Sequence, residues 1–173
     1  MPPVLLCRGI NSEIINRQSR TPMPSIPGLR SPYAKVGQFV YFGRMLDKIR
    51  LHATGRLPAE YVANLGDEKP NMFDARCCRV LGVRYAGLRA RTLQGGSDEE
   101  ILAWCRACGA ARTDDEITIW CRFIMKIGWR DERSSALQQR VREYNLVRKP
   151  VETFFDLIDY DEGRDPVATA AWL

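Results

Sequence analysis

The sequence has few of the residues and motifs on which common enzyme classes depend. It holds a single histidine, His52, and it contains no glycine-rich phosphate loop, no serine nucleophile elbow, no HExxH helix and no Walker lysine. The commonest catalytic classes therefore have no motif to support them. Whether the protein is an enzyme stays open at this point.

Long apolar runs are also missing. The longest uncharged run is the nine residues from Thr21 to Leu29, whereas a membrane-spanning helix needs roughly 18 apolar residues. Val4 to Cys7 supplies four apolar residues, against roughly 7–15 in a secretory signal. We therefore expect a soluble, cytoplasmic protein with reduced thiols and no membrane partner.

Acidic residues are scarce at the N-terminus, where proline is abundant. Residues 1–35 hold five basic residues against Glu13 alone, which accounts for four of the five net positive charges, and six of the ten prolines. Proline fixes φ and donates no backbone hydrogen bond, so this stretch is predicted to be extended. We divide the chain into a Pro-rich basic arm (1–28), one domain (29–165) and a short C-terminal tail (166–173). The arm is expected either to wrap the domain or to reach a partner.

The domain has ordinary globular composition, since the chain is 45% hydrophobic and 27% charged. Apolar residues recur at helical spacing over residues 38–53, 73–81 and 83–93. Two further helices are expected around residues 137–144 and 151–158. Because no stretch shows sustained strand alternation, the predicted fold class is all-α, a single compact multi-helix domain.

Two helix starts are marked by their capping residues. Ser97 with Glu100, and Thr113 with Glu116, both fit the capping box, in which each side chain satisfies the other residue's backbone N–H. We predict that the two helices they begin form a packed hairpin, with Gly109 as its hinge.

Six cysteines raise the question of a metal or redox site. Cys105 and Cys108 have CxxC spacing, and the neighbouring pair Cys77-Cys78 could complete a site. However, Cys105 and Cys108 both fall on the apolar stripe of their helix, at its C-terminal end, where the helix dipole does not lower a thiol pKa. We predict buried structural thiols, no metal site and no cofactor.

Two segments carry charge of one sign. Five arginines occur between Ala75 and Ser97 without an acid, namely Arg76, Arg79, Arg84, Arg89 and Arg91. Six acids near the C-terminus are opposed only by Arg164, namely Glu152, Asp156, Asp159, Asp161, Glu162 and Asp165. The segments either face each other, or form solvated surfaces, or the arginines bind phosphate or carboxylate groups.

His52 is the default general acid or base, because only histidine has an unperturbed pKa near neutrality, about 6.5. Cys77 or Cys78 could pair with it as a nucleophile, with Asp74 close by in sequence. The alternative is a half-buried histidine bonded to the backbone. If the helix of His52 packs on the 73–81 helix, polar residues of both could line one ligand-binding cleft. These candidate residues are Tyr41, Arg44, Lys48, His52, Asp74 and Arg76.

Several strings of the chain are similar to those of one bacterial family. They occupy residues 30–33, 40–52, 63–66, 73–79, 127–132 and 153–156. Through them the chain resembles, over roughly Leu29 to Arg164, the family catalogued as domain of unknown function 5069. The resemblance implies a small bacterial single-domain protein, and it implies no activity, cofactor or catalytic residue.

Three functional hypotheses follow. The first is a binding or accessory module whose polar cleft holds an anionic small molecule or a protein partner. The second is a nucleic-acid or ribosome-associated protein that uses the basic arm, the 76–91 arginines and an exposed Trp129. The third is a cysteine- or histidine-dependent enzyme, with His52, Cys77 and Asp74 as the candidate catalytic residues.

Overall fold

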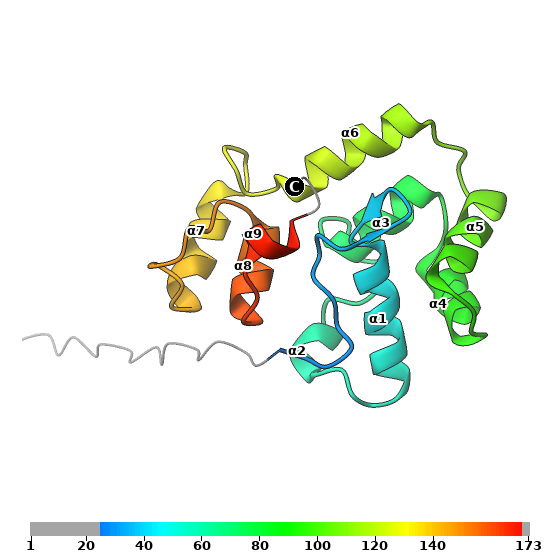
Figure 1. Cartoon of the computed structure of the whole chain (residues 1–173), viewed down its shortest axis with the longest axis horizontal. Helices are drawn as coiled ribbons and strands as arrows, with labels where there is room; N and C mark the ends of the chain where they lie inside the picture. Colours follow the sequence, from blue (N-terminus) through cyan, green and yellow to red (C-terminus); the bar gives the residue numbers. More distant parts are fainter. Residues whose placement is uncertain (1–24, 171–173) are drawn as a thin grey trace, which may run out of the picture.

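The computed structural model describes residues 25–170, and these residues form a mostly helical domain (Figure 1). Its elements are β1 (Lys35–Val36), β2 (Phe39–Val40), α1 (Phe42–Ala53), α2 (Ala59–Val62), α3 (Phe73–Leu81), α4 (Tyr85–Leu93), α5 (Asp98–Cys108), α6 (Asp114–Met125), α7 (Ser134–Glu143), α8 (Phe154–Asp161) and α9 (Pro166–Thr169). The predicted all-α class is therefore confirmed.

A small hairpin precedes the first helix. Lys35 pairs with Val40, and Val36 with Phe39, in an antiparallel ladder. The helix predicted over residues 38–53 therefore begins only at Phe42, because Phe39 and Val40 are used by the hairpin. Tyr41 lies between β2 and α1 and has a positive φ of 66°. This conformation is uncommon for a bulky residue.

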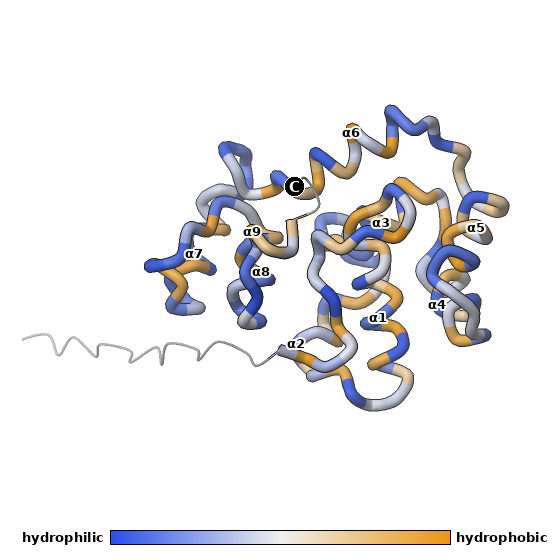
Figure 2. Tube along the Cα trace, in the orientation of Figure 1, coloured by the Kyte–Doolittle hydropathy of each residue, from blue (hydrophilic) through white to orange (hydrophobic). Residues whose placement is uncertain are grey.

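Helix α1 lies at the centre of the domain and packs against α4 and β1 (Figure 1). Its buried apolar side chains join one large core with those of α3 to α8. Figure 2 shows hydrophobic positions alternating with hydrophilic ones along α1, as expected for a helix that mixes apolar and polar contacts. The polar contacts include the groups described below.

Both predicted capping boxes are present, at Ser97 and at Thr113. The predicted packed hairpin of the two helices is wrong, however. Helix α5 packs mainly on α4 and β1, whereas α6 packs on β2 and extends toward α7 and α8 (Figure 1). Local capping signals determine where a helix begins, but they carry no information about its partners.

Residues of the predicted arm and of the predicted tail contact the domain. Residues 1–24 of the predicted arm lie outside the described residues, but Ile26 is buried in a small second cluster with Leu29, Leu51 and Leu57. At the other end, α9 falls in the predicted tail, and Thr169 donates a hydrogen bond of 2.6 Å to Asp159. Of the helices in residues 25–170, none has the length and apolar character needed to cross a membrane.

Candidate functional site

Three of the six predicted cleft residues meet in the interior of the protein. The Tyr41 hydroxyl donates to Asp74 Oδ1 at 2.8 Å, and Lys48 Nζ lies 3.0 Å from the Tyr41 hydroxyl and 2.5 Å from Asp74 Oδ1. Asp74 is fully buried, and Tyr41 and Lys48 are nearly so. The predicted packing of α1 near α3 thus brings these groups together, but away from solvent.

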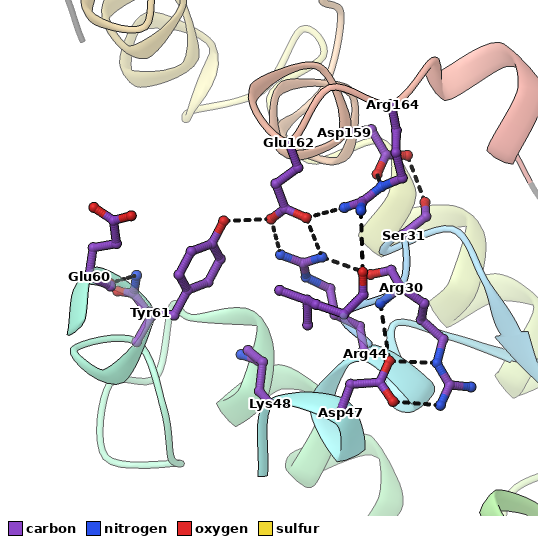
Figure 3. A network of polar contacts seen from close by, with 12 residues as sticks. Arg30, Ser31, Arg44, Asp47, Lys48, Glu60, Tyr61, Asp159, Glu162 and Arg164 are labelled. Carbon is purple, nitrogen blue, oxygen red and sulfur yellow. Dashed lines mark hydrogen bonds and ion pairs between the residues drawn. The ribbon is translucent and has the colours of Figure 1, made fainter. Parts of the chain in front are cut away.

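Arg44 belongs to a second buried group, which joins α1 to α8 (Figure 3). Its guanidinium donates to both carboxylate oxygens of Glu162 and, at 2.7 Å, to the backbone oxygen of Arg30. The Tyr61 hydroxyl donates to the same carboxylate at 2.7 Å, and Arg164 pairs with both Glu162 and Asp159. Ser31 closes the group with a 2.6 Å hydrogen bond to Asp159.

The other two predicted residues lie elsewhere. His52 is exposed near the end of α1, so the alternative of a half-buried histidine does not apply. Arg76 lies on α3, with its guanidinium over the ring of Phe123 on α6. The six residues therefore do not form the open polar cleft predicted for them, because four of them are buried and bonded to other buried groups.

Burial changes the ionisation of the Tyr41, Lys48 and Asp74 group. Burial lowers the pKa of Lys48, although the charge of Asp74 opposes it, and burial together with that charge raises the pKa of Tyr41 well above its ordinary value. Buried ion pairs of this kind carry a desolvation cost that a good geometry offsets. The Tyr41, Lys48 and Asp74 side chains are closed to solvent.

The four buried cysteines of residues 25–170 are not activated nucleophiles. Burial is the main cause of a raised pKa at Cys77, Cys78, Cys105 and Cys121, whereas a nucleophilic thiol requires a lowered one. Cys108 is exposed, so the prediction that it is buried with Cys105 is wrong: it lies at the last turn of α5. Within residues 25–170, no cluster of three or more His, Cys, Asp or Glu side chains is placed to hold a metal ion.

The two charged segments do not pair with each other in the part of the chain that is described. The acids of α8 and its C-terminal end instead pair with Arg44, Arg164 and the 29–33 segment. Arg84 pairs with Asp67 at 2.9 Å, and Arg79 and Arg91 bond backbone oxygens. The arginines of residues 76–91 are thus left at the surface. This excludes the interpretation that the basic segment and the acidic C-terminal segment face each other.

A cleft of about 1300 Å³ lies between the β-hairpin, α6 and the α8–α9 segment. We call it the α6–α8 cleft. The hairpin contributes Lys35 and Gln38, and α8 contributes Asp156 and Tyr160. The remaining walls come from α6, the loop after it, and the start of α9. None of the six predicted ligand-binding residues lines this cleft.

Four cationic side chains line the α6–α8 cleft, namely Lys35, Arg122, Lys126 and Arg130. All four are exposed, and among residues 25–170 no ion pair links any of them to an acid. Of the lining acids, Asp156 already accepts hydrogen bonds from Tyr33 and from the backbone N–H groups of Glu152 and Thr153. Within residues 25–170 these four cations have no ion-pair partner, although the carboxylates of Asp114, Glu152 and Asp156 also line the cleft.

Aromatic rings accompany these cations. Trp129 is 44% exposed, and Lys126 Nζ and the Arg130 guanidinium carbon lie 5.6 and 5.0 Å from its ring centroid. On the α8 side, Lys149 Nζ lies 5.3 Å from the ring centroid of Tyr160. Cation–aromatic contacts hold such side chains in place while leaving ring surface free for stacking.

Sequence reasoning missed most of this cleft. It identified Trp129 as exposed, which is confirmed, but it did not connect Trp129 with Lys126 and Arg130 on either side. The signal was local, since a tryptophan with basic residues three positions before and one position after it is an unusual surface composition. Lys35 and Tyr160 could not be found in this way, because only the fold brings residues 35 and 160 to α6.

Comparison with known proteins identifies a family. No curated protein matches the chain. A family model described as "Domain of unknown function (DUF5069)" matches residues 26–164. Its first residue is Ile26, the first buried apolar side chain among the described residues, so the match spans nearly all of the domain in residues 25–170. The chain therefore belongs to the DUF5069 family.

Proposed function

We propose that this protein is a binding module that holds an anionic ligand in the α6–α8 cleft. The observation that carries the proposal is the exposed Trp129 between Lys126 and Arg130 at that cleft. An anionic group would pair with the free cations, and a flat ring would stack on the indole. The ligand class with both features in one molecule is an aromatic phosphate or carboxylate, such as a nucleotide.

The buried cysteines and the exposed, isolated His52 support a binding role over a cysteine or histidine enzyme. A covalent mechanism needs a nucleophile and a base within hydrogen-bond reach of each other. Cys77 is fully buried and its pKa is raised, mainly by burial, whereas His52 faces solvent. This pair has neither the accessibility nor the activation that such catalysis requires.

The proposal is tested by titrating the protein with adenosine monophosphate, adenosine and inorganic phosphate, followed by the indole N–H signal of Trp129 in NMR spectra. A Trp129→Phe variant assigns that signal. We expect saturable shifts with adenosine monophosphate and much weaker ones with adenosine or phosphate alone, because the cleft needs ring and charge together.

A double variant, Lys126→Gln with Arg130→Gln, should weaken binding of adenosine monophosphate at least tenfold, since charge-assisted hydrogen bonds contribute about 1.5–3 kcal/mol each. Arg142→Gln is the matched control, because Arg142 is exposed on α7 and does not line the cleft. Equal affinity for adenosine and adenosine monophosphate, or equal loss in the control, would refute an anion site at this cleft.

A second candidate is single-stranded nucleic acid in the same cleft. Its volume of about 1300 Å³ exceeds the roughly 300–1000 Å³ of small-molecule sites, and the aromatic rings stand on two of its walls. This candidate predicts that a short oligoribonucleotide binds more tightly than adenosine monophosphate and that its affinity falls steeply with added salt. An affinity that does not change with salt would exclude it.

A further inference from the structure

Three guanidinium groups meet beside one loop, away from the α6–α8 cleft. Arg76 and Arg79 extend from α3, and Arg133 lies at the N-cap of α7. Arg76 Nε and Arg133 Nη1 lie 3.4 and 3.2 Å from the same backbone oxygen, that of Asn71. Arg79 donates to the backbone oxygen of Pro70 at 2.9 Å. We call these three residues the guanidinium cluster.

Neutral carbonyl oxygens hold the cluster, and no ion pair in residues 25–170 neutralises it. Burial and the charges of Arg133 and Arg79 lower the pKa of Arg76, although Glu132 and Asp131 oppose this. Asp131 is itself occupied, because its carboxylate accepts from the backbone N–H groups of Gly128 and Arg133. Each guanidinium carries five N–H donors, so most donors of the cluster have no hydrogen-bond partner within residues 25–170.

An exposed aromatic ring borders the cluster. Phe123 on α6 is 54% exposed, and the guanidinium carbon of Arg76 lies 5.8 Å from its ring centroid. Ile119, one helical turn earlier, is 68% exposed and extends the same apolar surface. Phe123 and the three arginines of the cluster do not line the α6–α8 cleft, although Arg122 and Lys126, one and three positions from Phe123, do.

We propose that the guanidinium cluster is a second anion site, which takes the phosphate group of a phosphate monoester whose organic part lies against Phe123. Gathering three like charges with no carboxylate in direct ion-pair contact is unfavourable in the free protein. A phosphate monoester carries about 1.5–2 negative charges at neutral pH and three acceptor oxygens, which match several guanidinium forks at once. This site shares no residue with the lining of the α6–α8 cleft, and its test follows different side-chain signals.

The experiment follows the side-chain Nε–H signals of Arg76 and Arg133 in NMR spectra at constant ionic strength. The probes are phenyl phosphate, inorganic phosphate, dimethyl phosphate and sodium chloride. We expect saturable shifts with phenyl phosphate, at least fivefold weaker binding of inorganic phosphate, and only linear shifts with chloride. Dimethyl phosphate should bind weakest of the phosphates, because a diester has one negative charge.

Arg79→Gln is the test variant, since Arg79 is exposed, whereas Arg133 also packs over the ring of Phe154 at 4.5 Å and would disturb the fold if replaced. The Arg79→Gln variant should bind phenyl phosphate at least fivefold more weakly. The control Arg142→Gln, which replaces an exposed arginine on α7, should bind it unchanged. Phe123→Ala should remove the preference for phenyl phosphate over inorganic phosphate. Linear shifts with every anion, no effect of Arg79→Gln, or equal binding of diester and monoester would each overturn the proposal.

Discussion

At the scale of single residues, the interior of this protein is unusually polar. Asp74, Asp159, Glu162, Arg44 and Lys48 are all buried, although charged residues are rarely buried unless they are paired. Each has an opposite charge within hydrogen-bond distance. Asp74 still has one carboxylate oxygen, Oδ2, without a hydrogen-bond partner, so its charge depends strongly on Lys48.

Lys48→Met is therefore expected to lower the free energy of unfolding by about 3–5 kcal/mol, because it leaves the buried Asp74 carboxylate without a counter-charge. Urea denaturation at neutral pH measures this. The double variant Lys48→Met with Asp74→Asn should recover part of the loss, since no unpaired charge remains. Lys35→Met, at an exposed lysine on β1, is the control and should stay within about 0.5 kcal/mol. A loss at Lys48 no larger than the control would contradict this account.

At the scale of elements, capping residues determine where several helices begin, and the contact between two helix ends depends on a small residue. Capping boxes begin α5, α6 and α8, at Ser97, Thr113 and Thr153. The ends of α3 and α5 meet at Gly109, where a Cβ atom would lie 2.1 Å from the backbone oxygen of Leu81. No side chain fits there, so this contact requires glycine.

Two glycine-to-alanine substitutions should therefore have opposite signs. Gly109→Ala is expected to destabilise the protein by at least about 2 kcal/mol, because backbone atoms must move apart. Gly87→Ala is expected to stabilise it by about 0.5–1 kcal/mol, since Gly87 lies inside α4 and its new Cβ would meet only Trp104, at 3.7 Å. Thermal and urea unfolding of both variants give the comparison. A Gly109→Ala variant as stable as the parent protein would show that the α3–α5 contact does not require glycine.

At the scale of the whole molecule, Glu162 joins parts that are far apart in the chain. Its carboxylate binds Arg44 on α1, Tyr61 on α2 and Arg164 after α8 (Figure 3). Burial by itself raises the pKa of Glu162, but the charge and hydrogen bonds of Arg44, together with the charge of Arg164, outweigh burial and hold the pKa below its ordinary value.

Acid should therefore loosen the whole domain through Glu162. Because the unfolded chain binds this proton more readily than the folded one, the stabilisation is complete above the ordinary glutamate pKa of about 4.3 and is lost as the pH falls through the lower folded value. The urea-derived free energy of unfolding should fall between about pH 5 and pH 3, and the fall should be shallower in Glu162→Gln. Glu99→Gln, at an exposed glutamate on α5, should leave the slope unchanged. An identical slope in Glu162→Gln would contradict this role.

The sequence by itself determined the helical fold class, the family and the positions of several helices. Periodicity placed α3, and capping residues placed the starts of α5 and α6, because both depend on neighbours within one helical turn. The same reasoning placed α1 too early, since the pairing of Phe39 with Val36 competes with the helix. It identified Tyr41, Lys48 and Asp74 as a group, but not that the group is closed to solvent.

Only the tertiary structure decided which charges are buried and which are free. The acids of α8 resembled a surface patch in the sequence, yet they pair with Arg44, Ser31 and Arg164 inside the fold. The cations of the α6–α8 cleft come from residues 35, 122, 126 and 130, and the guanidinium cluster joins residues 76 and 79 to 133. Whether a charge is compensated depends on groups distant in sequence, and the chain brings these together only when it folds.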